Sequence, residues 1–123
     1  MTPAELNTIL RNQPKLSAAG FRTSHWDGAD EDFADNRQWL RDRIGQVNDS
    51  IRFLEQCSRT KTFRKSRSSY GLKHDAENME GNSYVCNGAM IVALIHLGFR
   101  YKHDGKDSPN IDVAIKVPDH LWN

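Results

Sequence analysis

A chain of 123 residues is long enough for one domain and too short for two comfortable hydrophobic cores. With 37% hydrophobic and 27% charged residues, its composition excludes a chain that is disordered over most of its length. Seventeen Lys and Arg residues against sixteen Asp and Glu residues give a net charge of +1, which excludes a protein that is basic or acidic throughout. We therefore expect a soluble domain with a balanced charge.

The cysteines and the N-terminal segment indicate the compartment. Cys57 and Cys86 lack a CxxC spacing, which argues against a disulfide framework or a zinc pair and favours a reduced, cytosolic protein. The N-terminal segment has no basic and apolar regions of a signal peptide, and no stretch reaches the roughly 18 apolar residues of a membrane span. We expect a protein that is neither secreted nor membrane-spanning.

The first predicted helix begins at a capping box. Thr2 is followed by Pro3 and then by Glu5, a combination typical of a helix N-terminus. We expect this helix to end near Arg11. From Gly20 to Asp35 the chain is acidic and irregular, which predicts a loop that leads into the next helix.

A long amphipathic helix is predicted from about Asp32 to Cys57. Its apolar residues recur at spacings of seven, four, three, four and three, which places them on one stripe. They are Phe33, Leu40, Ile44, Val47, Ile51 and Leu54. Such a stripe can serve a coiled-coil dimer, but its few heptads favour packing within the domain.

Charge is strongly segregated in one place, the stretch from Arg59 to His74. It contains six Lys and Arg residues and no Asp or Glu. A local basic segment on a nearly neutral chain indicates a site for phosphate or for an acidic surface. The alternatives are a solvated linker and an internal pairing with the acidic residues between Asp27 and Asp35.

Two helices and a hairpin are predicted beyond the basic segment. The helices span about Tyr70 to Met79 and Val85 to Leu97, and the second is apolar on nearly every face, with Gly98 as its cap. Two strands, Phe99 to Lys102 and Ile111 to Val117, flank a polar turn. The predicted fold class is α+β: a mainly helical single domain with a long amphipathic helix, a helix-turn-helix-like pair and a C-terminal antiparallel β-hairpin.

The same pattern predicts one domain over residues 1–123. Its parts are an N-terminal helical part, 1–58, a basic connector, 59–69, and the helix pair with the hairpin, 70–123. The basic connector thus lies between the two structured parts of the domain.

The order helix, turn, helix and hairpin is that of a winged helix-turn-helix, which suits a DNA-binding regulator. A recognition helix must present polar or basic side chains to base edges, whereas the second helix offers little beyond Asn87 and His96. Specific major-groove readout is therefore disfavoured. The remaining nucleic-acid hypothesis is a salt-dependent, weakly selective contact, in which Tyr70 or Phe63 stacks on a base.

The densest group of ionisable residues overlaps the end of the basic segment and consists of Tyr70, Lys73, His74, Asp75 and Glu77. Tyr70, Lys73, His74 and Glu77 share one face of the predicted helix. They suit a general acid–base pair in a small enzyme or, as the simpler interpretation, an ordinary helical ion pair. Short metal-ligand spacings and known nucleotide or hydrolase motifs are absent from the sequence. We therefore predict no catalytic residue, no metal and no cofactor.

Three short motifs carry a resemblance to known proteins. They are Ser68-Ser69-Tyr70-Gly71-Leu72-Lys73-His74, Tyr84-Val85-Cys86-Asn87-Gly88-Ala89 and Leu97-Gly98-Phe99. Over about its C-terminal half, the chain resembles small uncharacterised proteins carried by proteobacterial phages, plasmids and integrative elements. The resemblance implies a genetic setting and no particular mechanism. Small proteins from such elements often act by binding, as transcriptional regulators or as inhibitors of host defence complexes such as CRISPR effectors.

These observations predict a non-enzymatic binding protein, a monomer or homodimer in the cytoplasm of a bacterial host. Its expected partner is DNA, RNA or a host defence complex that handles nucleic acid, as for an anti-CRISPR-type inhibitor, and not a membrane. The alternatives are a winged-helix regulator and a small enzyme that uses His74. The predicted binding residues are Arg59, Lys61, Arg64, Lys65, Arg67, Tyr70, Lys73 and His74.

Overall fold

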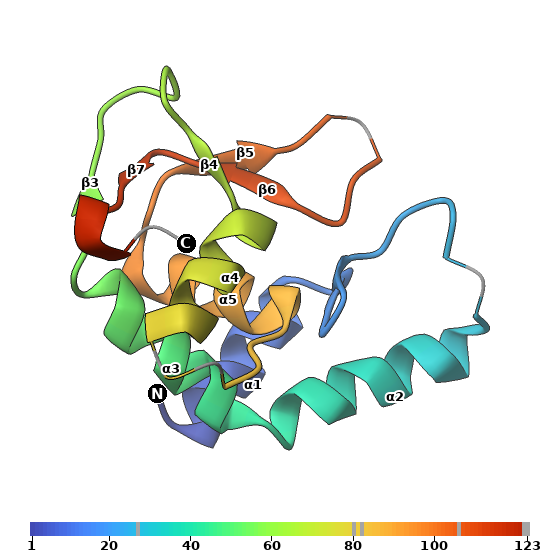
Figure 1. The fold of residues 1–123 in the computed structure, drawn as a ribbon. Coiled ribbons are helices and arrows are strands. Elements are labelled where there is room, and N and C mark those ends of the chain that lie inside the picture. Colours follow the sequence, from blue (N-terminus) through green and yellow to red (C-terminus); the bar gives the residue numbers. More distant parts are fainter. Residues whose placement is uncertain (27, 80, 82, 106, 122–123) are drawn as a thin grey trace.

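The computed structural model of this protein describes residues 1–26, 28–79, 81, 83–105 and 107–121. Over these residues, helices and small antiparallel sheets form the α+β fold that the sequence predicts (Figure 1). The helices are α1 (Pro3–Asn12), α2 (Asp30–Arg41), α3 (Ile44–Leu54), α4 (Ser69–Met79), α5 (Asn87–Leu97) and the 3-10 helix η1 (Asp119–Leu121). Asp27, part of the predicted acidic loop, lies outside the described residues.

The strands are short and pair in an antiparallel manner. They are β1 (Leu16–Ser17), β2 (Gly20–Phe21), β3 (Ser58–Arg59), β4 (Arg67–Ser68), β5 (Tyr101–His103), β6 (Ile111–Val113) and β7 (Ile115–Lys116). β1 pairs with β2, β3 with β7, and β6 lies between β4 and β5. The predicted hairpin is confirmed, because Tyr101 of β5 lies opposite Val113 of β6. The second predicted strand divides at Ala114, so that β7 pairs with β3 instead of extending the hairpin.

The start of α1 confirms the predicted capping box. The Thr2 hydroxyl accepts a hydrogen bond from the Glu5 N–H, and the Glu5 carboxylate accepts one from the Thr2 N–H. The helix turns Leu6 and Leu10 into the core, where both are fully buried. A local signal in the sequence thus sets the start of the helix, and its apolar face attaches the helix to the rest of the domain.

The prediction of one long helix is wrong, because α2 and α3 are separated by a turn at Asp42 and Arg43. The backbone of Arg43, with φ −120° and ψ 45°, is not helical. Figure 1 shows α2 extending away from the other helices, whereas α3 lies among them. The apolar stripe continues across the turn, so Leu40 and Val47 are both buried. Hydrophobic periodicity therefore predicted the buried face and could not detect the change of direction.

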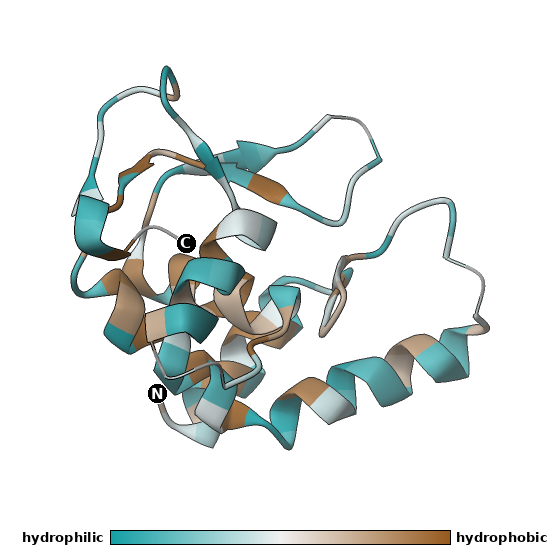
Figure 2. Ribbon diagram, viewed as in Figure 1, coloured by the Kyte–Doolittle hydropathy of each residue, from teal (hydrophilic) through white to brown (hydrophobic). Residues whose placement is uncertain are grey.

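Packing within the domain, and not a coiled-coil dimer, accounts for the apolar stripe of α3. Val47, Phe53 and Leu54 are buried, and α3 packs against α5 at the centre of the core. Figure 2 shows hydrophobic segments within the cluster of α1, α3 and α5, and hydrophilic segments along much of α2. The intramolecular interpretation of the stripe is confirmed.

α5 is the central helix, and residues 87–94 of it are buried. Gly88 permits the close approach of β1, because a Cβ atom there would lie 1.9 Å from the Ser17 carbonyl oxygen. The Gly88 N–H instead donates a 2.9 Å hydrogen bond to the Ala18 carbonyl. At its other end the helix is capped, as predicted, by Gly98 in the left-handed conformation, with φ 76°. Since other elements enclose α5, it cannot enter a DNA groove as a recognition helix does.

Candidate functional site

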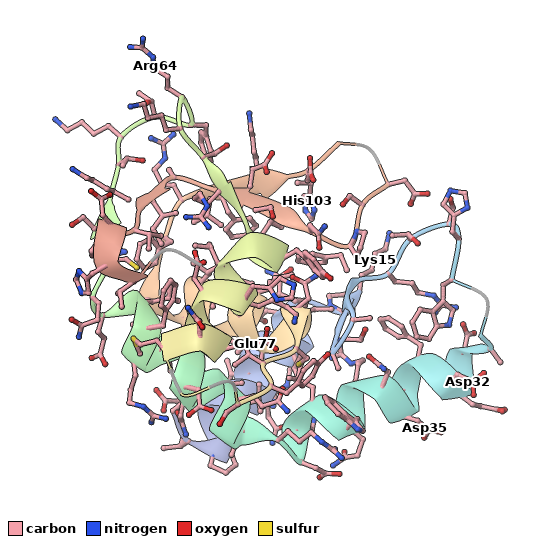
Figure 3. The ribbon with its side chains drawn as sticks, in the orientation of Figure 1. Lys15, Asp32, Asp35, Arg64, Glu77 and His103 are labelled. Atoms are coloured by element: carbon pink, nitrogen blue, oxygen red, sulfur yellow. The ribbon has the colours of Figure 1, made fainter. Side chains whose placement is uncertain are left out.

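The central part of the basic segment is a loop whose two ends are paired into sheets. β3 pairs with β7 and β4 pairs with β6, so residues 60–66 between them project from the domain (Figure 1). We call residues 60–66 the basic arm. Lys61, Arg64 and Lys65 are exposed on it, and Figure 3 shows Arg64 at its outermost point.

Two further cations lie near Phe63 of the basic arm: Arg100, which directly precedes β5, and Lys102, which lies in β5. The Arg100 guanidinium lies 5.6 Å from the centroid of the Phe63 ring, and the Lys102 ammonium lies 5.1 Å from it. Arg100 also donates a 2.6 Å hydrogen bond to the Lys61 carbonyl. The predicted binding residues did not include these two cations. The alternation of apolar and basic residues over 99–102 was the available signal, because it places both cations on one face of the strand.

Most of the cations around Phe63 are not neutralised by the protein. Among the exposed cations around Phe63, Lys61, Arg64, Lys65 and Arg100 form no salt bridge within the described part of the chain. Lys102 is also exposed, but it lies opposite an acidic residue, Asp112, in the hairpin. Partial burial raises the pKa of Asp112, and Asp104 raises it further, whereas Lys102 lowers it. The arm and Arg100 therefore present a positive surface to an external anion.

Arg59 and Arg67 differ from the arm residues because both contact the protein itself. The Arg59 guanidinium donates to the Leu97 carbonyl, and its central carbon lies 4.4 Å from the centroid of the Phe99 ring. Arg67 forms a 2.6 Å ion pair with Asp75, whose side chain is only 2% exposed. These two predicted binding residues thus help to hold the fold together.

Lys73 also turns inward and lies at a second candidate site, on the first turns of α4. It is 5% exposed, and its ammonium lies 5.4 Å from the centroid of the Tyr70 ring and 4.8 Å from that of Tyr84. Both tyrosines are more than half exposed, at 52% and 59%. Tyr84 was not among the predicted binding residues, although it opens the second motif of the resemblance.

Glu77 connects the side chains at this second site. Its carboxylate accepts hydrogen bonds from the Lys73 ammonium at 3.2 Å and from the Val85 N–H at 3.0 Å. Its other oxygen lies 2.9 Å from Nδ1 of His74, which packs edge-on against Tyr70 with ring centroids 4.7 Å apart. Lys73, His74 and Glu77 on this face of α4 therefore form a network of helical ion pairs, as the simpler interpretation predicts.

Tyr70 and Tyr84 line a groove of about 370 Å³, which we call the tyrosine groove. Its remaining wall includes Ala18, Ala19, Asn87, Pro109 and Asn110. Nδ2 of Asn87 donates to the carbonyls of Ala19 and Pro109 and, at 2.9 Å, to Oδ1 of Asn110. Oδ1 of Asn87 is buried with no hydrogen-bond partner among the described residues. The tyrosine groove thus combines exposed rings with carboxamide groups.

The acidic residues of α2 lie at the opposite end of the molecule from the basic arm. Asp32 and Asp35 line a neighbouring groove of about 410 Å³, and Asp30 pairs with Arg22 at 2.9 Å. Figure 3 shows Asp32 and Asp35 far from Arg64. An internal pairing of the basic segment with the acidic stretch is therefore not formed over the residues that the structure covers.

Both cysteines are free thiols. The Cys86 sulfur caps α5 by accepting a hydrogen bond from the Ala89 N–H. Burial raises the pKa of Cys86, and burial with a smaller contribution from Asp75 raises the pKa of Cys57 to about 11. Both thiols therefore stay protonated at neutral pH. Within the described ranges, no three His, Cys, Asp or Glu side chains gather as metal ligands.

The longest described helix, α2, has 12 residues. None of the helices over the described residues combines the length and the apolar character that crossing a bilayer requires. Comparisons with protein-family models, with curated proteins and with solved structures find no match to this chain.

Proposed function

We propose that the protein is a non-enzymatic binding protein of a phage or other mobile element. In this proposal, the basic arm binds the phosphates of a nucleic acid, which is free or held in a host defence complex. The observation that supports it is the exposed group formed by Lys61, Arg64, Lys65 and Arg100 around Phe63, with no salt bridge to these four cations among the described residues.

Exposed cations bind nucleic acid because they release the counterions that are condensed on the phosphates. If these four cations each engage about one phosphate, the log–log slope of affinity against salt is about −3 for a single strand and about −3.6 for a duplex. Phe63, which is half-buried beside Arg100 and Lys102, offers an aromatic surface for a base at the same place. Such a surface favours charge and stacking over sequence-specific readout.

The test is a charge reversal on the arm, Arg64→Glu with Lys65→Glu. Arg67 stays unchanged because its ion pair with Asp75 makes it a poor probe of binding. The matched control is Arg11→Glu with Lys15→Glu, which changes the net charge equally at two exposed cations outside the arm. Both variants are titrated with labelled single-stranded and duplex oligonucleotides over a range of salt concentrations.

We expect the arm variant to lose affinity and to reduce the magnitude of the salt slope by about 1.5 to 2, whereas the control retains most of both. Equal binding by the arm variant and the native protein would contradict the proposal. A pull-down from bacterial lysate, with and without nuclease treatment, then separates the two settings. Free nucleic acid predicts that nucleic acid alone is captured without nuclease and is lost with it, and a host complex predicts that protein is captured together with the nucleic acid.

A further inference from the structure

We infer that the tyrosine groove binds a nucleobase, held between or against the rings of Tyr70 and Tyr84. This inference deepens the proposed function, on which it rests, because it assigns the base to the groove and the phosphates to the basic arm. The base can belong to a single strand or to a free nucleotide, since both present the same planar, hydrogen-bonding group. A duplex does not, because its bases are stacked and paired.

The two tyrosines are the principal observation. They are the large hydrophobic side chains most open to solvent among the described residues, at 52% and 59%, although aromatic rings usually gain from burial. One cation positions both rings, because the Lys73 ammonium lies within 5.4 Å of each ring centroid. A pair of exposed and pre-positioned rings suits stacking on a planar ligand, since little side-chain freedom remains to be lost.

Two backbone hydrogen bonds hold the segment that directly follows Tyr84. The Val85 N–H donates to Glu77, and the Cys86 N–H donates to Oε1 of Gln46 at 2.9 Å. Glu77 also holds Lys73, so one carboxylate links the lysine to the backbone beside Tyr84. The two walls of the groove are therefore coupled, and the distance between the rings depends on packed and hydrogen-bonded residues.

Polar recognition comes from Asn87, which is 6% exposed and lines the groove. Its Nδ2 is occupied by three acceptors, among them Oδ1 of Asn110, whereas its Oδ1 has no partner in the part of the chain that the structure describes. A buried acceptor without a partner is uncommon, and an N–H group of a ligand can pair with it once the groove wall shifts to expose it. Nucleobases carry such donors at their edges and present flat faces to aromatic rings.

The basic arm leads directly to the tyrosine groove. β4 follows the arm and ends at Ser68, and α4 starts at the next residue and carries Tyr70 on its first turn. The Ser69 hydroxyl accepts a hydrogen bond from the Ile111 N–H, which ties this junction to β6. The arm and the groove are therefore joined by the two residues of β4 and the first turn of α4.

The test compares oligothymidylate of about ten nucleotides, within the usual site size of such proteins, with an abasic oligomer of equal length and charge. The variants are Tyr70→Ala and Tyr84→Ala, with Tyr70→Phe and Tyr84→Phe as matched controls that keep the ring. Asn87 is unsuitable as a probe because its three hydrogen bonds support the fold. A further titration uses thymidine monophosphate alone, followed by NMR.

For the native protein we expect roughly 5- to 150-fold tighter binding of oligothymidylate than of the abasic oligomer, as one or more stacked bases provide. Each alanine variant should lose much of this difference and keep the salt slope, while the phenylalanine variants keep both. Equal affinity for the two oligomers, or no effect of the alanine variants, would overturn the inference while leaving the arm proposal intact.

The titration with thymidine monophosphate decides the remaining cases. Thymidine monophosphate that saturates the groove with an affinity near that of the oligomer identifies a free nucleotide as the ligand. If neither oligomer binds, the arm proposal fails, and the inference then depends on thymidine monophosphate alone. In that case, a titration with thymidine monophosphate that gives no saturable shifts at residues of the groove would overturn the inference as well.

Discussion

Arg67 and Asp75 form a 2.6 Å ion pair between β4, directly after the basic arm, and the middle of α4, with the Asp75 side chain only 2% exposed. The pair joins the strand that anchors the basic arm to the helix that carries the tyrosine groove. Arg67, which the sequence predicts to bind a partner, therefore forms a contact that stabilises the fold. We therefore expect Arg67 to contribute to the free energy of unfolding, and the exposed cations of the basic arm to contribute little to it.

Arg67→Ala should lower the free energy of unfolding by about 3 to 5 kcal/mol, because it leaves the Asp75 carboxylate buried without this partner. Arg64→Ala, on the exposed arm, should change the same quantity by less than about 0.5 kcal/mol. Urea denaturation followed by circular dichroism measures both. Similar stabilities for the two variants would show that the Arg67–Asp75 pair adds little to the fold.

Gly88→Ala should destabilise the protein by about 1 to 3 kcal/mol or more, since the new Cβ would lie 1.9 Å from the Ser17 carbonyl oxygen and the backbone there must shift. Gly45→Ala in α3 is the matched control, because no atom lies within 4 Å of its Cβ position. That control should stabilise the protein by about 0.5 to 1 kcal/mol through helix propensity. Thermal melts of the two variants should therefore move in opposite directions.

Glu77→Gln should destabilise the domain by about 1 to 3 kcal/mol, because it removes the charge that pairs with the buried Lys73 ammonium. Glu55→Gln is the control, because Glu55 is exposed at the end of α3. Chemical denaturation compares the two. The NMR chemical shifts of Tyr84 and Val85 should change in the Glu77 variant and not in the Glu55 variant. Unchanged shifts in the Glu77 variant would contradict the proposal that Glu77 links Lys73 to the backbone beside Tyr84.

Cys57 should react slowly with iodoacetamide, because its pKa is raised from 9.0 to about 11, mainly by burial. At pH 9 roughly half of an unperturbed thiol is ionised and about 1% of Cys57, so the native rate should be about fiftyfold below that of the urea-unfolded chain. Since the folded pKa is the higher one, stability linked to this thiol is present below pH 9 and is lost as the pH rises towards 11. Peptide mapping by mass spectrometry reports Cys57 separately from Cys86, and equal native and unfolded rates would contradict the shift.

Local features of the sequence predicted much of the fold. The capping box at Thr2, the glycine cap at Gly98 and the apolar run of α5 depend on neighbouring residues, so they could be read without the structure. The turn at Asp42 and Arg43 could not, because the apolar stripe continues through it and hydrophobic periodicity reports only which face is buried.

For the candidate site, the sequence by itself determined the concentration of positive charge and the helical face shared by Tyr70, Lys73 and Glu77. Only the tertiary structure decided which cations are exposed, because the ion pair of Arg67 depends on a partner brought close by the packing of α4 on β4. Folding likewise brought Arg100 to the arm and Tyr84 to Tyr70. Charge and periodicity are properties of neighbouring residues, whereas burial, ion pairing and grooves arise from contacts between segments that are distant in the chain.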